Sequence, residues 1–365
     1  MKYKKIALVH YWLVNWRGGE LVLRDAARAL KDYDVYIYTH VIDEKLKSHF
    51  PKNVKFKTTF INHLPFAKKF YQLYILLMPL ALKALNLDDY ELIITFESGP
   101  AKGIKTKYNN RHISYVHSPM RYIWDMHDEY IQSSSLLEKI YLKIITPILR
   151  AWDIKTSKYP KKIICNSNFV KKRIKKYWNR NAEVVYPGID IVNTQKYHSE
   201  NFYLFIGELN HYKKADLVFD AFKQSGRRLK IIGKGPFYNQ FSNSYTDNID
   251  ILGRVSDEKK WQLIKSCKAL IFPSKEDFGL VPIEAMIFGK PVIAFNSGGA
   301  KETVINGKTG YLFNEQNVSS LNEKINVFEK NYLDFDSNEI IKHGHSFSSK
   351  EFQKNFFSII TKQLL

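Results

Sequence analysis

Short, continuously apolar segments alternate with helical stretches along the chain, in two series. The first series is Lys5–His10, Asp34–Thr39, Leu92–Phe96, Ile113–His117 and Lys162–Asn166. The second series is Tyr203–Gly207, Leu229–Gly233, Ile249–Gly253, Ala269–Pro273 and Pro291–Phe295. Strands that are apolar along their whole length are typical of parallel sheets covered by helices on both faces. Two such series predict two doubly wound, Rossmann-like α/β domains.

A polar stretch after Tyr186–Asp190 marks the expected boundary between these domains. We expect an N-terminal domain of residues 1–190, a second domain of residues 191–345, and a C-terminal helix in residues 346–365 that packs back on the first domain. Ligands of open α/β sheets bind beyond the carboxyl ends of the strands. We therefore expect the ligand in a cleft that the two domains share.

The charge of the chain is uneven. The 365 residues include 56 Lys and Arg and 36 Asp and Glu, a net charge of +20, of which residues 1–200 carry +16. Residues 155–180 hold ten basic side chains and no acidic one. Such a face suits a polyphosphate, a nucleic acid or an anionic membrane, or it only keeps the surface solvated. Charge alone leaves these alternatives open.

Composition favours a cytoplasmic protein that is soluble or peripheral to a membrane. Cys165 and Cys267 cannot make a disulfide framework. The apolar run Ile6–Val9 is too short for a signal peptide, and Tyr74–Leu82 is too short to span a bilayer. The segment Phe66–Leu85 predicts one or two helices with a broad apolar face beside three lysines. These helices either pack in the core or lie among lipid headgroups.

Two loops after predicted strands suit a phosphorylated ligand. Arg17–Glu20 (RGGE) follows the first strand and opens a helix, whose free amide groups and glycines can approach a phosphate unless the segment is a plain tight turn. Lys213 and Lys214 follow the first strand of the second domain. They can neutralise a diphosphate, or they are an ordinary surface pair.

A third loop carries two carboxylates, Glu276 and Glu284, within EDFGLVPIEAM. Pro282 suits the first position of a helix, which would place Glu284 in the first turn and Glu276 in the loop before it. Carboxylates accept hydrogen bonds from neighbouring sugar hydroxyls, and free backbone amides at residues 278–280 can face an anion. Taken alone, the pair is also consistent with helix capping.

The ordered set of segments resembles a known family. EDFGLVPIEAM is followed by GKPVI and SGGAKE and preceded by YLFIGELNHYKKADLVFDAF, LKIIGKGP and ILGRVSDE. This order is similar to that of the retaining nucleotide-sugar glycosyltransferases of family 4, which have the GT-B fold. HYWLVNWRGGE, ISYVHSPMRYIWD and IICNSNFVKKRI resemble the bacterial O-antigen mannosyltransferase subgroup.

The resemblance implies an activity and a location. It implies transfer of a hexose from a nucleotide-sugar to a lipid-linked or saccharide acceptor in surface polysaccharide synthesis. The first candidate for the hexose is mannose, with GDP-mannose as the donor. It implies peripheral binding to the anionic inner face of the cytoplasmic membrane, no nucleic-acid partner, and neither a metal nor another cofactor. Retaining transfer of this kind needs charge stabilisation of a leaving diphosphate more than it needs a nucleophile.

The resemblance also implies residue roles in the second domain. Glu276 would bind hydroxyls of the donor sugar, Glu284 the ribose, and Lys213 a phosphate. The backbone of Phe278, Gly279 and Leu280 would contact sugar and diphosphate.

In the first domain, Gly18 and Gly19 would approach the diphosphate, and His117 would be the active-site histidine near the sugar, unless it is an ordinary core histidine. Arg121 lies in the same motif with no assigned role. Glu208 stands where the family has an arginine, and we expect it to turn away from the phosphates or to pair with a cation, Lys214 being the nearest in sequence.

Other functions remain alternatives. A nucleotide-sugar epimerase of the same fold would need no acceptor, and a phosphorylase would need a lysine that anchors pyridoxal phosphate, for which no motif is present. A nucleic-acid-binding protein would use Lys155–Arg180 and bind with a steep salt dependence, but the sequence contains no recognised nucleic-acid-binding module.

Overall fold

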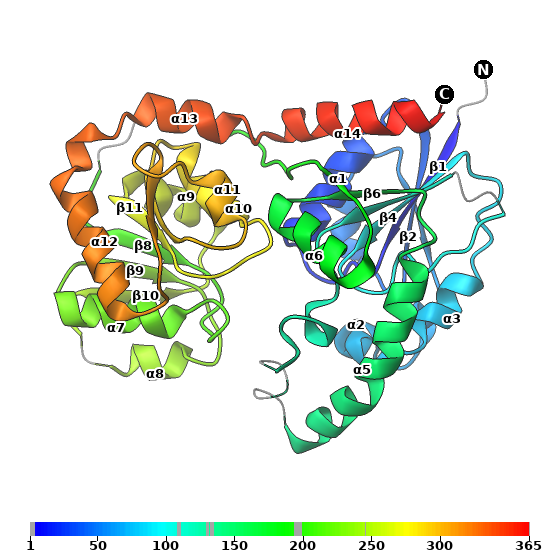
Figure 1. The fold of residues 1–365 in the computed structure, drawn as a ribbon, viewed down its shortest axis with the longest axis horizontal. Coiled ribbons are helices and arrows are strands. Elements are labelled where there is room, and N and C mark those ends of the chain that lie inside the picture. The colour runs from blue at the N-terminus through cyan, green and yellow to red at the C-terminus, as the bar shows by residue number, and fades with distance from the viewer. Residues whose placement is uncertain are drawn as a thin grey trace. The chain divides into compact units, whose positions relative to one another are not determined.

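The computed structural model describes residues 4–107, 111–128, 131, 135–192, 199–244 and 246–364. The chain divides into two units, Met1–Gly188 with Lys350–Leu365 and Ile189–Ser349. Each unit contains one sheet with helices on its faces (Figure 1).

The first unit holds a seven-stranded parallel sheet in the order β3-β2-β1-β4-β5-β6-β7. Its strands are β1 (Lys5–His10), β2 (Asp34–Thr39), β3 (Lys55–Thr58), β4 (Leu92–Glu97), β5 (His112–Val116), β6 (Lys162–Cys165) and β7 (Glu183–Val184). Its α-helices are α1 (Gly18–Ala29), α2 (Ala67–Phe70), α3 (Met78–Lys83), α5 (Leu136–Thr156), α6 (Asn168–Trp178) and α14 (Ser349–Leu364).

The second unit holds a six-stranded parallel sheet in the order β10-β9-β8-β11-β12-β13. Its strands are β8 (Tyr203–Ile206), β9 (Leu229–Ile232), β10 (Ile249–Gly253), β11 (Ala269–Phe272), β12 (Val292–Phe295) and β13 (Gly310–Phe313). Its helices are α7 (Ala215–Ser225), α8 (Tyr238–Ser242), α9 (Asp257–Ser266), α10 (Leu280–Met286), α11 (Ala300–Thr303), α12 (Val318–Lys330) and α13 (Ser337–His345).

The prediction of two doubly wound, Rossmann-like sheets is confirmed, and every predicted strand is present. Three further strands were not predicted, and each is an outer strand of its sheet: β3, β7 and β13. Outer strands need fewer apolar residues than central ones, so β3 alternates lysine with other residues and β7 is only two residues long.

The segment Phe66–Leu85 contains two short α-helices, α2 and α3, so the prediction of one or two helices is confirmed, although a 3-10 turn separates them. α2 has four residues, a 3-10 turn follows at Tyr71–Tyr74, and α3 has six. Pro79 lies at the start of α3, where a residue without an N–H group is tolerated and an uninterrupted helix is not. The buried side chains of this segment pack against Ile145 and Leu149 of α5.

The end of the chain belongs to both units. The Ile189 N–H donates to the Phe347 carbonyl over 3.0 Å, and the Ser349 N–H donates to the Ile189 carbonyl over 2.8 Å. These bonds hold residues 347–349 to the second unit, which therefore extends past the expected end at residue 345. The next residues return to the first unit, where α14 buries three side chains in its core: Phe352, Phe356 and Ile360. Within the described ranges, no helix is both long and apolar enough to cross a bilayer.

Candidate functional site

The second unit brings two of the predicted site residues together where its strand order reverses. From the centre of the sheet the order runs β8-β9-β10 in one direction and β11-β12-β13 in the other. The loops after β8 and β11 therefore leave in opposite directions, and ligands of open α/β sheets bind at such a point. Lys213 lies in the first loop and Glu276 in the second.

Lys213 and Glu276 form an ion pair. The Lys213 Nζ lies 2.5 Å from Oε1 of Glu276, and the two side chains are 25% and 17% exposed. The Ser274 hydroxyl donates to the same Glu276 oxygen over 3.0 Å, and the Tyr212 hydroxyl donates to the Lys275 carbonyl over 3.3 Å. The two loops are thus joined by side chains that remain partly open to solvent.

Two glycines of the next loop fix the shape of the loop that carries Glu276. The Gly299 N–H donates to the Glu276 carbonyl over 2.8 Å. A Cβ atom on Gly298 would lie 2.3 Å from that carbonyl oxygen, and one on Gly299 would lie 2.2 Å from Cα of Phe278. Gly298 also has a φ of +68°, which favours glycine. The glycines therefore let the backbone carrying Glu276 and Phe278 lie directly against the loop after β12.

Glu284 lies deeper in its helix than predicted. α10 begins at Leu280 with Gly279 as its N-cap, so Pro282 is its third residue and Glu284 its fifth. Pro282 is tolerated there because the first four N–H groups of a helix have no partner within the helix. The expectation that Glu284 occupies the first turn is therefore wrong.

Glu284 is paired with a lysine that the sequence analysis did not identify. Lys260 of α9 places its Nζ 3.1 Å from Oε1 of Glu284, and the two side chains are 19% and 14% exposed. Burial raises the pKa of the Glu284 carboxyl, whereas Lys260 lowers that pKa. The lysine thus helps to keep a half-buried glutamate ionised.

Glu208 follows β8 and its side chain is exposed. Among the described residues it forms no ion pair, so the expected pairing with Lys214 is not found. Its carbonyl accepts from the N–H of Asn210 over 2.9 Å, and the Asn210 side chain accepts from the N–H of Lys213 over 2.9 Å. The Asn210 side chain, rather than the Glu208 side chain, therefore helps to position the backbone of Lys213.

The first unit gathers its candidate residues at the carboxyl ends of β1 and β5. Gly18 and Gly19 open α1, and the Glu20 side chain accepts from the N–H of Arg17 over 2.9 Å. A Cβ atom on Gly19 would lie 3.8 Å from Nε2 of His117, which directly follows β5. The start of α1 thus lies in van der Waals reach of this histidine, and the one tight contact of such a Cβ atom would be with the Tyr11 hydroxyl, at 3.0 Å.

The sequence analysis missed His10 at this site. It is the last residue of β1, only 1% exposed, and its Nε2 lies 3.7 Å from Oε1 of Glu20. Neither of its ring nitrogens has a hydrogen-bond partner in the part of the chain that the structure describes. The only signal in the sequence was its position at the end of a strand next to the RGGE segment.

The loop after β5 is held by Arg173 of α6. The guanidinium donates to the Ser118 hydroxyl over 2.7 Å and to the Pro119 carbonyl over 3.2 Å, and it pairs with Asp125. In the sequence Arg121 lies between Pro119 and Asp125, at the start of a 3-10 turn, and its side chain is half-buried. Arg173 thereby fixes the loop that begins at His117.

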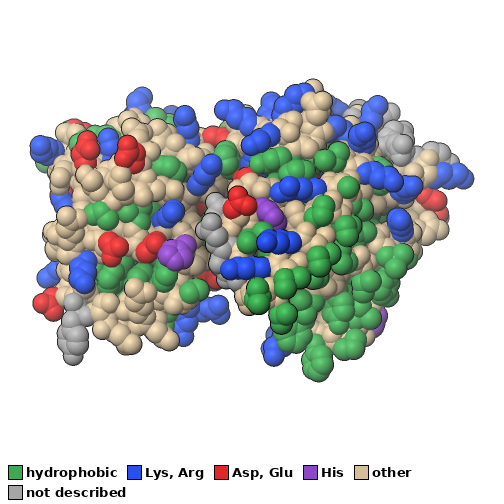
Figure 2. Space-filling model, turned by 60° about the horizontal axis from the view of Figure 1, so that its bottom comes forward, with side chains coloured by type: hydrophobic (Ala, Val, Ile, Leu, Met, Phe, Trp, Pro, Cys, Tyr) green, Lys and Arg blue, Asp and Glu red, His purple; other side chains and the backbone are tan. Residues whose placement is uncertain are grey.

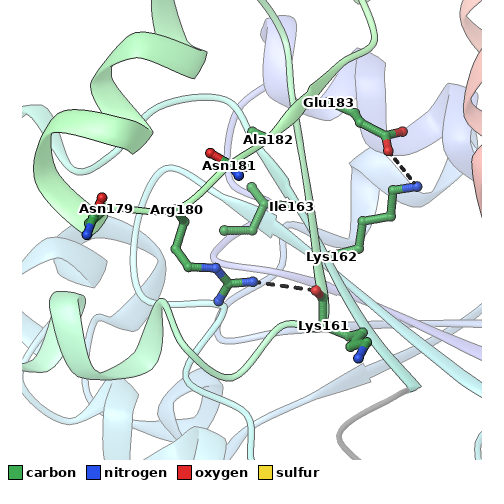
Figure 3. A pocket seen from close by; sticks show the side chains of 8 residues that line it. All are labelled: Lys161, Lys162, Ile163, Asn179, Arg180, Asn181, Ala182 and Glu183. Carbon is green, nitrogen blue, oxygen red and sulfur yellow. Dashed lines mark hydrogen bonds and ion pairs between the residues drawn. The ribbon is translucent and has the colours of Figure 1, made fainter.

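Part of the basic segment 155–180 serves the fold. Figure 3 shows a pocket at the amino ends of β6 and β7, the edge opposite the candidate site of this unit. There Arg180 donates to the carbonyls of Ser157 and Pro160 over 2.6 and 2.9 Å, and Lys162 pairs with Glu183 over 2.9 Å. These cations already have protein partners. In the described ranges, no group of three His, Cys, Asp or Glu side chains is placed to hold a metal.

Comparison with known proteins identifies the family. Residues 16–192 match the family described as Glycosyltransferase Family 4, and residues 189–345 match the family described as Glycosyl transferases group 1. An uncharacterized glycosyltransferase of Methanocaldococcus jannaschii is 27% identical over 350 residues, 93% of this chain and 90% of that protein. An alpha-1,3/1,6-mannosyltransferase of Dictyostelium discoideum is 27% identical over 315 residues, 70% of this chain and 71% of that protein.

The solved structures agree on the fold. The Anabaena protein HepE, in complex with UDP, has a TM-score of 0.66 at 17% identity, with 98% of this chain and 100% of that chain covered. Together the two family matches extend from residue 16 to residue 345, almost the whole chain. The chain is a glycosyltransferase of the GT-B fold.

Proposed function

We propose that the chain is a retaining hexosyltransferase that uses a nucleotide-sugar donor, with GDP-mannose as the first candidate. Its acceptor is a lipid-linked or other saccharide in surface polysaccharide or O-antigen synthesis, met at the inner face of the cytoplasmic membrane. The similarity to an alpha-1,3/1,6-mannosyltransferase supports mannose, and the UDP in the HepE structure supports a nucleotide-sugar donor. The motifs HYWLVNWRGGE and ISYVHSPMRYIWD support the O-antigen subgroup.

The observation that carries the proposal is the Lys213–Glu276 pair where the strand order reverses. In the proposed complex Glu276 accepts hydrogen bonds from the donor sugar, Glu284 binds the ribose, and Lys213 binds the diphosphate. The backbone at residues 278–280 contacts sugar and diphosphate. The Phe278 side chain is 3% exposed and its ring packs at a tilt against that of Phe347, with 5.8 Å between the ring centroids, so its backbone is the part available to a ligand.

The proposed reaction breaks the bond between the anomeric carbon and the phosphate oxygen and forms a bond to the acceptor oxygen on the same face of the sugar. The departing phosphate takes the proton of the acceptor hydroxyl. The protein therefore has to stabilise negative charge on the leaving group. Lys213 and the backbone at Gly18 and Gly19 are assigned this role, with His117 next to the sugar and neither a metal nor another cofactor involved.

Thermal unfolding with GDP, UDP, ADP and TDP tests the donor class. A nucleotide at 100 times its dissociation constant stabilises the protein by about 2.7 kcal/mol. With all four nucleotides at the same concentration, we expect GDP to give the largest increase in the unfolding temperature. NMR of the product then tests retention of the anomeric configuration. Stabilisation by none of the four nucleotides would contradict the proposal, and sugar conversion without an acceptor would favour the epimerase.

A further inference from the structure

Exposed apolar side chains are concentrated in two segments of the first unit. Sixteen large apolar side chains are exposed among the described residues, and thirteen of them lie in residues 60–80 or in α5. The other three, Ile191, Ile305 and Leu333, are scattered over the second unit. Isolated exposure of this kind is ordinary, whereas a continuous apolar patch marks an interaction surface.

The two segments lie side by side. Their inner faces share one buried cluster, in which Met78 and Ala81 pack with Ile145 and Leu149 of α5. Figure 2 shows the hydrophobic side chains gathered on one side of the first unit. We call the exposed parts of residues 60–83 and of α5 the apolar face.

α5 contributes an outer stripe that its inner packing does not use. Its exposed residues Leu137, Ile140, Ile144 and Ile148 lie within about 80° of one another around the helix, at roughly 100° per residue. They are 80%, 50%, 61% and 57% exposed. A helix with a second apolar stripe, turned away from the core, has a partner other than its own core.

Lysines border the apolar face. Lys68, Lys69 and Lys83 lie in the first segment, and Lys143 lies on α5, all four exposed. The chain has no Asp or Glu between residues 60 and 87. On α5 one acidic side chain, Glu138 of the first turn, is also exposed, so the border carries four lysines and one glutamate. An apolar centre with a net cationic border matches an anionic bilayer, in which acyl chains lie beneath phosphate headgroups. The same border disfavours a second copy of this chain, because two surfaces of the same net positive charge repel each other.

We propose that the apolar face is a membrane-binding surface that inserts its leucine, isoleucine and phenylalanine side chains at the headgroup boundary of an anionic bilayer. The inference rests on the proposed function, since a lipid-linked acceptor is carried by a bilayer, and it specifies which residues meet that bilayer. Binding has two parts: the lysines attract the anionic surface and the apolar side chains hold the protein there.

Flotation of the full chain with vesicles of phosphatidylethanolamine and about 30% phosphatidylglycerol tests the proposal at an ionic strength of about 0.1 M. We expect the unchanged protein to float with these vesicles, and Leu137→Glu with Ile144→Glu to reduce the bound fraction at least about tenfold. Phe70→Ser with Leu73→Ser, in the other segment, should give the same loss. The control is Leu333→Glu, an equally apolar and 94% exposed position in the second unit, which should float like the unchanged protein.

Failure of the unchanged protein to float, or flotation of both double variants like the unchanged protein, would overturn the proposal. Sedimentation that shows a dimer dissociated by the same substitutions would assign the surface to a second copy and would also overturn it. Nucleotide-induced stabilisation and donor hydrolysis without vesicles report the proposed function separately. A protein that floats but binds no nucleotide would therefore contradict the proposed function and not the assignment of this surface.

Discussion

Replacing Lys213 and Glu276 separately and together distinguishes a lysine that binds phosphate from one that only positions a carboxylate. The Lys213 Nζ and the Glu276 Oε1 lie 2.5 Å apart, and the two side chains are 25% and 17% exposed. Measured exposed ion pairs contribute about 0.2–1 kcal/mol, and both side chains of this pair are mostly buried, so we take the upper end of that range, about 1 kcal/mol.

The sign of the coupling follows from whether the pair persists during the reaction. If Lys213 moves to the leaving phosphate, the unchanged enzyme must break the Lys213–Glu276 ion pair during the reaction. Each single variant loses one contact with the donor but saves the cost of breaking that pair. The double variant loses both contacts and saves the same cost once rather than twice. Its loss of kcat/KM then exceeds the product of the two single losses by about fivefold, which corresponds to about 1 kcal/mol.

The assay is release of nucleoside diphosphate from GDP-mannose at low donor concentration. We expect Lys213→Ala to lose about a hundredfold or more, as for other groups that stabilise a developing anion. Glu208→Ala is the control, because its exposed side chain forms no ion pair among the described residues. If the double variant loses no more than Glu276→Ala alone, Lys213 only positions Glu276 and the assignment to phosphate is refuted.

Three further perturbations test other parts of the structure. Lys260→Met removes the cation that opposes the effect of burial on the pKa of Glu284, so nucleotide affinity should fall at neutral pH and recover in part when the pH is raised. Gly298→Ala forces the loop after β11 to move, because the new Cβ atom would lie 2.3 Å from a carbonyl oxygen, and donor affinity should fall at least about tenfold. Burial lowers the pKa of His40 to about 4, whereas the pKa in the unfolded chain is near 6.5. Between these two pH values His40 is mostly protonated in the unfolded chain and mostly neutral in the folded protein. Acidification from about pH 7.5 to 5.5 should therefore cost about 1.4 kcal/mol of stability through this residue, a loss that His40→Gln should remove in urea unfolding.

Each of these predictions has a matched control. Lys259→Met removes an exposed lysine next to Lys260 and should leave nucleotide affinity unchanged at every pH. Gly307 has a φ of +79° with no atom within 4 Å of a Cβ, so Gly307→Ala has the same backbone strain without the clash. Equal losses of donor affinity in both glycine variants would contradict the steric argument. An unchanged pH dependence in His40→Gln would contradict the assignment of that loss to His40.

The sequence predicted the central strands and the loops that follow them, because buried parallel strands are marked by their own uninterrupted apolar residues. It placed Lys213 and Glu276 on different loops of one sheet edge, and the structure shows them in contact. It did not identify Lys260, because the pairing of Lys260 with Glu284 depends on how α9 lies against α10 and no local pattern encodes that contact. The apolar stripe of α5 was missed for a similar reason, since periodicity alone does not tell which of two apolar stripes faces the core.

The lysine partners explain how a site for an anionic donor can contain two glutamates. Unpaired, Glu276 and Glu284 would repel a diphosphate, and the repulsion would increase with the burial that both side chains show. In the structure each carboxylate faces one lysine, so each pair is neutral overall. A diphosphate that attracts Lys213 leaves Glu276 free to accept hydrogen bonds from the sugar hydroxyls. In the proposed complex Lys260 has the opposite task, since Glu284 would bind ribose hydroxyls as a carboxylate and would need a cation that stays. One lysine is therefore expected to change partners during the reaction, whereas the other is expected to keep its partner.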